Sequence, residues 1–192
     1  MDKKKIRKSI NKFYDEIAKE EAGVKVDIDK LNTSLGYSKE DLEDIPEEAQ
    51  LGLGCGNPGE KGKPKLGETV ADLGSGKGMD AFLAAKAVGQ SGLVIGIDNN
   101  STMVEKAREI AGKRGFTNTQ FRLGEIEYIP IADNTLDLLM SNCVINLSTD
   151  KPQVYKDIYR VLKPGGRISL SDIALKKELP DEIKKDPKVH GT

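Results

Sequence analysis

The sequence predicts an α/β fold built on a doubly wound, mostly parallel sheet. Three observations support this prediction: short apolar runs alternate with helical segments from residue 68 onward, the first run ends in a glycine-rich turn, and the last helical segment is followed by Lys-Pro-Gly-Gly. Such alternation is typical of a parallel sheet that is covered by helices on both faces. A chain of 192 residues is also long enough to bury a sizeable core.

The chain divides into three predicted regions. Residues 1–67 are expected to form a helical cap and then a cysteine loop, since the stretch Gly52–Gly67 is rich in Gly, Pro and Lys. Residues 68–173 contain the alternating pattern and are expected to form the ligand-binding domain. Residues 174–192 are polar and charged, and we expect them to be the start of a C-terminal region that is cut short after the fifth strand.

Helices are predicted from apolar spacing and from residues that start or stop a helix. Ile6, Ile10 and Ile17 recur at helical spacing and predict an N-terminal helix. Thr102 and Glu105 have the spacing of a capping box at the start of another helix. The helices expected within the second region are Asp80–Val88, Thr102–Gly112 and Gln153–Leu162.

Five short apolar runs predict the strands of the sheet. The last of them is expected to begin after Lys163–Gly166, because Pro and paired Gly residues end a helix and turn the chain. The expected strands are Thr69–Leu73, Leu93–Asp98, Thr119–Leu123, Leu136–Asn142 and Arg167–Ile173.

Composition argues against several classes of partner. The 30 Lys and Arg residues nearly cancel the 31 Asp and Glu residues, so no net charge attracts nucleic acid or an anionic membrane. No apolar run approaches the ~20 residues of a membrane span. We therefore expect a cytoplasmic protein with reduced thiols. Two cysteines and one histidine, Cys55, Cys143 and His190, are too few for a structural zinc site.

The turn after the first strand has the pattern of a cofactor-binding loop. A P-loop would need Gly in place of Ala71 and Ser or Thr in place of Gly78, and Gly78 stands one place early for a dinucleotide-binding turn. The pattern Asp-x-Gly-x-Gly-x-Gly remains, and it resembles the first motif of the class I, Rossmann-like methyltransferases. The matching residues are Asp72-Leu73-Gly74-Ser75-Gly76-Lys77-Gly78.

This resemblance implies S-adenosylmethionine as the cofactor, bound by Asp72 and by the turn residues Gly74, Ser75 and Gly76. Asp98 ends the second strand, where a carboxylate can accept both hydroxyls of a ribose. Asn99 is then expected beside the sugar or the adenine.

Two further segments complete the predicted cofactor site. In the family that this chain resembles, the loop after the third strand covers adenine, which implies an apolar contact from Ile126 and a polar contact from Glu127. Asn142 ends the fourth strand, at the carboxyl edge where ligands bind in open α/β sheets. We therefore expect Asn142 to contact the cofactor.

Four other segments resemble the arsenite methyltransferases within this class. They are Ser141–Ser148 and Leu53–Pro58, each of which contains a cysteine, together with Ile131–Asn134 and Leu179–Glu182. The resemblance implies transfer of a methyl group from S-adenosylmethionine to thiolate-bound trivalent arsenic, as a detoxification reaction. It also implies arsenite or its glutathione conjugate as substrate, and thioredoxin or glutathione as the thiol reductant.

The two cysteines fit this chemistry. Trivalent arsenic is soft, and soft thiolates select soft centres, so Cys55 and Cys143 are predicted as the catalytic residues and the As(III) ligands. The lone pair of arsenic can attack the sulfonium methyl in line, so no general base is needed. Cys55 is flanked by glycines, and we expect it to lie on a mobile loop. A cysteine that ends a buried strand, like Cys143, is otherwise usually a small core residue.

The chain also departs from the arsenite methyltransferases. Tyr14 is followed by Asp15, where these enzymes usually have a glycine in a lid over the cofactor. Their third arsenic-binding cysteine lies shortly after the position of Pro187, and this sequence ends at Thr192 without it. The third ligand is then expected from glutathione or another small thiol, and without one we expect methylation to stall. The two strands that usually follow the fifth are also not expected within residues 174–192.

Two alternative functions stay open at this point. The cofactor motifs would equally serve a methyltransferase for a small organic acceptor, such as a quinone or a sterol. The chain could also be a module that binds the cofactor or the metalloid without turnover. Only the first alternative predicts a turnover that is insensitive to thiol alkylation.

Overall fold

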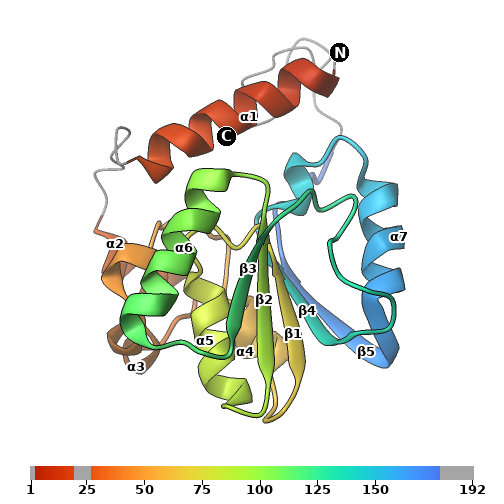
Figure 1. Cartoon of the computed structure of the whole chain (residues 1–192). Helices are drawn as coiled ribbons and strands as arrows, with labels where there is room; N and C mark the ends of the chain where they lie inside the picture. Colours follow the sequence, from red (N-terminus) through yellow and green to blue (C-terminus); the bar gives the residue numbers. More distant parts are fainter. Residues whose placement is uncertain (1–2, 20–26, 178–192) are drawn as a thin grey trace.

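The computed structural model describes residues 3–19 and 27–177. Its centre is a parallel sheet of five strands in the order β3-β2-β1-β4-β5 (Figure 1). The predicted fold class is therefore confirmed. The strands are β1 (Thr69–Leu73), β2 (Leu93–Asp98), β3 (Thr119–Leu123), β4 (Leu136–Asn142) and β5 (Leu162–Ser171).

The first four strands have the predicted bounds, but the predicted start and end of β5 are wrong. Leu136 of β4 pairs with Leu162, whereas Leu138 pairs with Arg167, so the residues between Leu162 and Arg167 form an irregularity in the pairing. Gly165 has φ +81° there, which only glycine adopts without cost. The Pro-Gly-Gly signal thus marks a bulge inside β5, and the helix before it already ends at Val161.

Helices cover both faces of the sheet, and each face has its own apolar core. Val70, Phe82 and Leu138 belong to one core, while Leu73, Leu139 and Ile158 belong to the other. Figure 1 shows α4, α5 and α6 on one face and α7 on the other. The four helices are α4 (Pro58–Gly62), α5 (Met79–Val88), α6 (Ser101–Arg114) and α7 (Lys151–Val161).

The N-terminal helix is confirmed, since α1 (Lys3–Ala18) buries Ile6, Ile10 and Ile17. The prediction that Gly52–Gly67 is loop throughout is wrong, because α4 lies within it and begins at an Asn57 cap with Pro58 at its first position. The short elements not predicted from the sequence are α2 (Ile28–Ser34), α3 (Lys39–Asp44), η1 (Glu47–Ala49) and η2 (Ile145–Leu147).

The predicted cap of α6 is also wrong. The side chain of Asn100, and not that of Thr102, accepts the hydrogen bond from the Met103 N–H, so the helix begins at Ser101. Thr102 instead donates its hydroxyl proton to Asp15 of α1 over 2.9 Å. This contact attaches α1 to the body of the protein.

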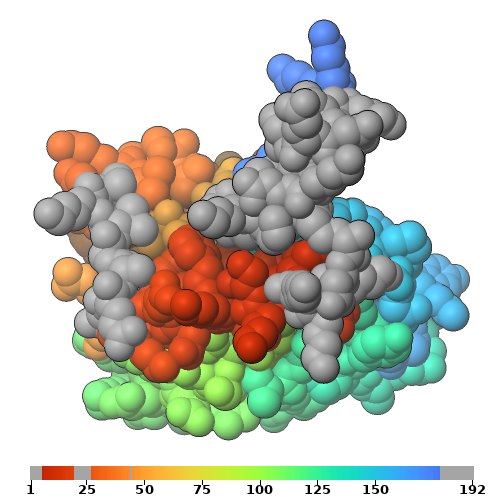
Figure 2. Space-filling model, turned by 90° about the horizontal axis from the view of Figure 1, so that it is seen from above, coloured from red at the N-terminus to blue at the C-terminus, as the bar shows by residue number. Residues whose placement is uncertain are grey.

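Seen from above in Figure 2, α1 (red) extends across the face where the strands have their carboxyl ends. None of the helices in the described part of the chain is long and apolar enough to cross a membrane. Of the predicted third region, only 174–177 is described. His190, Pro187 and the segment Leu179–Glu182 lie outside the described residues.

Candidate active site

The glycine turn connects β1 to α5 in the conformation that its sequence requires. Gly74, Gly76 and Gly78 have φ values of +68°, +52° and +98°. The amides of Gly74 and Ser75 both donate to the Ile97 carbonyl, at 2.7 and 3.0 Å. A Cβ atom at Gly74 would collide with the side chain of Val144, so the turn packs directly against the segment that follows β4.

Asp98 holds this turn from the end of β2. Its carboxylate accepts the Gly76 N–H and the Asn100 N–H, both over 2.9 Å. Burial raises the pKa of Asp98, and these two hydrogen bonds oppose the rise. Asn99 is exposed and donates to the Glu125 carboxylate over 3.4 Å. Both residues line the same pocket as the glycine turn.

Asp72 is the buried acid of the turn and is 2% exposed. Burial, followed by the negative charges of Asp80 and Asp98, raises its pKa well above the usual range. Ser75 lies beside it in the turn, and its buried hydroxyl has no hydrogen-bond partner among the described residues. The pocket therefore contains buried acidic groups close to one another and an unsatisfied hydroxyl in its glycine turn.

The loop after β3 forms one wall of the pocket, where both Ile126 and Glu127 lie. Glu127 is 3% exposed, and its carboxylate accepts hydrogen bonds from Arg7 over 2.9 Å and from Ser148 over 2.7 Å. The expected polar residue is thus in the pocket, but its carboxylate also anchors α1 through Arg7.

Helix α1 forms the roof of the pocket. Arg7, Ile10, Asn11 and Tyr14 all line the cavity from above. Burial, and then the negative charge of Asp98, raises the pKa of the Tyr14 hydroxyl. Tyr14 therefore lies over the pocket even though Asp15 follows it in place of glycine.

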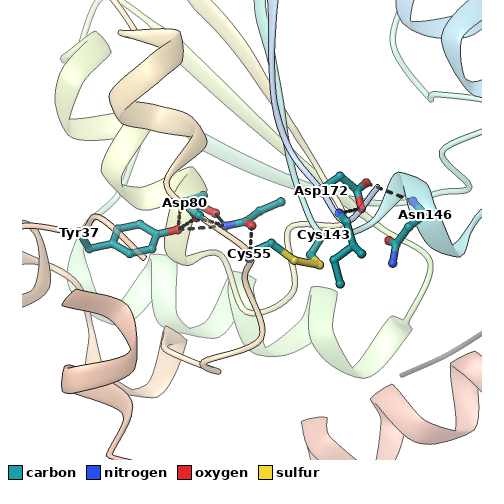
Figure 3. Close-up of a disulfide and its surroundings, with 9 residues drawn as sticks. Tyr37, Cys55, Asp80, Cys143, Asn146 and Asp172 are labelled. Atoms are coloured by element: carbon teal, nitrogen blue, oxygen red, sulfur yellow. Dashed lines mark hydrogen bonds between the residues drawn. A yellow bond between two sulfur atoms is a disulfide. The ribbon is translucent and has the colours of Figure 1, made fainter. Parts of the chain in front are cut away.

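The two cysteines meet at the carboxyl end of β4. Cys55 and Cys143 are 88 residues apart, yet their Cα atoms are 5.5 Å apart and their sulfurs form a disulfide (Figure 3). The sequence led us to expect reduced thiols; the structure instead joins the pair, because the Cys55 loop and the end of β4 pack together. Cys143 also has φ +60°, a left-handed conformation that costs a non-glycine residue ~1–2 kcal/mol. Such strain in a non-glycine residue is often found at functional sites.

The loop that contains Cys55 is fixed in place, contrary to the expectation of mobility. The Cys55 N–H donates to the side-chain oxygen of Asn142 over 2.8 Å. A Cβ at Gly54 would lie 2.7 Å from the Asn142 amide nitrogen, and one at Gly56 would lie 2.9 Å from the Ser171 hydroxyl. The glycines therefore allow close packing here, which is the other common reason for glycine beside a functional residue.

Two residues of this site were not singled out for it from the sequence. Tyr37 lies between α2 and α3, is 4% exposed, and donates its hydroxyl proton to Asp80 over 2.7 Å. Asp80 in turn accepts from the Asn142 amide nitrogen over 3.0 Å. Neither Tyr37 nor Asp80 belongs to a short sequence motif. For Asp80, the one available signal was its position two residues after the last glycine of the turn.

The chemistry of the pocket fits S-adenosylmethionine, which has a sulfonium and an ammonium group. Asp72, Asp80 and Asp98 line the pocket and can neutralise positive charge, while Ile126 and Tyr14 offer apolar surface. The described residues contain no group of three or more His, Cys, Asp or Glu side chains that could hold a metal ion.

Comparison with known proteins places the chain in a family. A family model described as a methyltransferase domain matches residues 64–191. The chain therefore belongs to the methyltransferase-domain family, and its sheet is that of the Rossmann-like methyltransferases. Membership implies S-adenosylmethionine as the methyl donor, as the sequence predicted.

Within this family, the chain is similar to arsenite methyltransferases. It is 48% identical to that of Halobacterium salinarum over 153 residues, which are 80% of this chain and 39% of the relative. It is 35% identical to the human arsenite methyltransferase, over 93% of this chain and 50% of the relative. The crystal structure of an arsenic(III) S-adenosylmethionine methyltransferase from Chlamydomonas reinhardtii is 36% identical, with a TM-score of 0.66, over 87% of this chain and 55% of that one. The chain thus spans about half the length of these relatives, or less.

Proposed function

We propose that this protein transfers the methyl group of S-adenosylmethionine to trivalent arsenic held by Cys55 and Cys143. One observation carries the proposal: the two cysteines come together, with Cα atoms 5.5 Å apart, and Cys143 lines the same pocket as the glycine turn. The similarity to arsenite methyltransferases supports the same substrate.

For the cofactor, we propose that the motif residues Asp72, Gly74, Ser75 and Gly76 surround its amino-acid part and that Asp98 accepts hydrogen bonds from the ribose. Further contacts are proposed for residues that line the same pocket: Asn99, Ile126, Glu127 and Asn142. The bound cofactor supplies a methyl group on a positively charged sulfur. The carboxylates of the pocket stabilise this charge until the transfer removes it.

The thiolates hold arsenic with its lone pair free to attack the methyl carbon in line. With S-adenosylmethionine bound there, the As–C bond would form as the C–S bond breaks, sulfur would lose its positive charge, and arsenic would be formally oxidised from +3 to +5. No proton moves, so the protein contributes alignment, which can be worth several orders of magnitude in rate. Two electrons from thiols must then restore trivalent arsenic before a further methylation.

A thiol reductant, thioredoxin or glutathione, is therefore part of the proposal. Opening the Cys55–Cys143 disulfide also needs two electrons from such a thiol, because a disulfide sulfur offers no thiolate to arsenic. The cytoplasm supplies these conditions, and we place the activity there. A small thiol would provide the third arsenic ligand. We further propose that residues 1–67 act as the cap and cysteine loop, residues 68–173 as the cofactor domain, and residues 174–192 as the start of a C-terminal region.

The proposal is tested by calorimetric titration of the reduced protein with arsenite, in the presence of S-adenosylmethionine. We expect arsenite binding that is abolished by thiol alkylation and by Cys143→Ser, while the cofactor affinity of the Cys143→Ser variant changes by less than about threefold, since its side chain is nearly isosteric. The oxidised protein serves as the matched control and should bind the cofactor but no arsenite. Arsenite affinity that is unchanged in Cys143→Ser would contradict the proposal.

A further inference from the structure

The side-chain amide of Asn142 links the two cysteines. Asn142 directly precedes Cys143 at the end of β4, and its oxygen accepts the Cys55 N–H over 2.8 Å. Its nitrogen lies 2.7 Å from the Gly56 carbonyl on the other side of Cys55. The amide therefore binds the backbone of the cysteine loop on both sides of the thiol.

Only one orientation of this amide can form both contacts, and Asp80 favours that orientation. The Asp80 carboxylate lies 3.0 Å from the Asn142 nitrogen and can only accept hydrogen bonds when ionised. If the amide were rotated by 180°, its oxygen would face the carboxylate and its NH2 group would face the Cys55 N–H. Asp80 thus acts on Cys55 through Asn142.

Tyr37 contacts both Asp80 and Asn142, and its hydroxyl oxygen also lies 3.1 Å from the Gly56 carbonyl of the cysteine loop. Its hydroxyl donates to the second carboxylate oxygen over 2.7 Å and accepts from the Asn142 nitrogen over 3.0 Å. Figure 3 shows Tyr37 and Asp80 together on one side of the disulfide. Asp80 is the second residue of α5, directly after the glycine turn, so this network connects the cofactor turn to the cysteine loop.

We propose that Asp80 and Tyr37 are positioning residues that hold Cys55 within bonding distance of Cys143, Asp80 through the Asn142 amide and Tyr37 through that amide and the Gly56 carbonyl. The expected effect on arsenite binding rests on the proposed function, whereas the positioning of the two thiols does not. Two thiols that are held together bind one metalloid atom more tightly than two independently moving thiols, because the second bond forms at a high effective concentration. The same effective concentration sets how readily the pair forms a disulfide.

The test measures the thiol pair directly in the full chain. Protein is equilibrated with mixtures of reduced and oxidised glutathione, and the fraction of Cys55–Cys143 disulfide is read by alkylation and mass spectrometry. In this equilibrium the two thiols give two electrons to glutathione disulfide, which yields the protein disulfide and two molecules of reduced glutathione. The equilibrium constant is the effective concentration of the pair.

We expect Tyr37→Phe to lower this constant about fivefold, as for the loss of one hydrogen bond. Asp80→Ala removes both acceptors and should lower it about tenfold or more. Tyr159→Phe is the matched control, because Tyr159 is 84% exposed on α7 and does not line the pocket. It should leave the constant unchanged. Arsenite affinity should fall in parallel in the first two variants.

Two results would overturn the inference. One is a constant within twofold of the unsubstituted protein in both variants. The other is a fall in the thermal midpoint of unfolding with no change in the constant, which would indicate a role in stability alone. If the constant falls as expected but the unsubstituted protein binds no arsenite, the positioning role stands and the proposed function fails.

Discussion

Two regions next to the pocket, called here the thiol side and the loop side, hold their carboxylates in different ways. On the thiol side, formed by Tyr37, Cys55, Asp80, Asn142 and Cys143, the Asp80 carboxylate is bound by a hydroxyl and an amide. Burial raises the pKa of Asp80 despite these hydrogen bonds.

The loop side, formed by residues 125–131 and α7, reaches the pocket only through residues 125–127, and its Asp157 and Arg160 lie outside the pocket lining. There the Asp157 carboxylate is bound by the Arg160 guanidinium over 2.8 Å. The hydrogen bonds from Arg160 lower the pKa of Asp157. Arg160 also donates to the carbonyls of Ile129 and Ile131, at 2.9 and 2.8 Å, so the charge pair is part of the scaffold.

The two regions differ in what their buried charges do: those of the loop side stabilise the fold, and those of the thiol side can bind a ligand. The loop side supplies its own cation and is complete without a ligand. The thiol side and the neighbouring Asp72 keep buried negative charge that a cationic ligand can neutralise, at a cost to the stability of the free protein.

The largest expected effect comes from removing the cation of the loop side. Arg160→Ala should lower the free energy of unfolding by about 2–4 kcal/mol, because it leaves Asp157 buried without its partner and strips two backbone carbonyls of a donor. Urea denaturation at neutral pH measures the change. Tyr159→Ala, an exposed neighbour on the same helix, is the control and should change stability by less than about 1 kcal/mol. An equal loss in both variants would contradict a specific role for the guanidinium.

Removal of charge beside the thiol side should have the opposite effect on stability. Asp72→Asn keeps the shape of the side chain and removes a buried charge, so we expect about 1 kcal/mol of added stability at pH 7. The raised pKa of Asp72 means that the folded state binds more protons than the unfolded state, so this group's contribution becomes less favourable as pH rises. The gain should disappear at low pH.

The same variant should bind S-adenosylmethionine about tenfold more weakly, since it removes charge from the cation-binding pocket. Calorimetry of the cofactor titration, with S-adenosylhomocysteine as a ligand that lacks the sulfonium charge, measures the effect. The loss should be smaller for S-adenosylhomocysteine. If Asp72→Asn were less stable and bound both ligands with unchanged affinity, the charge of Asp72 would serve the fold and not the ligand, as on the loop side.

The smallest expected effect concerns the pH dependence of the loop side. A carboxylate with a lowered pKa stabilises the fold above its ordinary pKa of about 3.9, and this contribution is lost as pH falls through the lowered value. Asp157→Asn should therefore cost about 1 kcal/mol at pH 6 and progressively less toward pH 3. Urea midpoints across this range test it. A cost that stays constant with pH would show that the charge of Asp157 is not what stabilises the loop.

The sequence predicts those parts of the fold that depend on local pattern. Thr69–Leu73 and Leu136–Asn142 are apolar runs buried on both faces of a parallel sheet, so their bounds follow from hydrophobicity alone. The fifth strand could not be placed in this way, because a bulge that contains Pro164 and Gly165 has the same composition as a turn. Helix α3 has a capping box formed by Ser38 and Asp41, which is a local signal for the start of a helix.

The site is predictable only where a motif covers it. Gly74 and Asp98 follow from the turn pattern and its spacing, and both line the pocket. Cys55 and Cys143 are 88 residues apart, and their pairing depends on how their two segments pack in the folded protein. Sequence spacing rules describe short distances along the chain and do not predict such a contact. The roles of Tyr37 and Asp80 could not be predicted for the same reason, since their contacts are made by residues that only the tertiary fold brings together.

The contact between Gly74 and Val144 constrains how this sequence can change. The space that a side chain at position 74 would need is already filled by Val144. A substitution at Gly74 therefore needs a smaller residue at 144 and a backbone that tolerates φ +68°. The cofactor turn and the residue after the second cysteine are therefore coupled in evolution, because a side chain can appear at position 74 only after position 144 has become smaller.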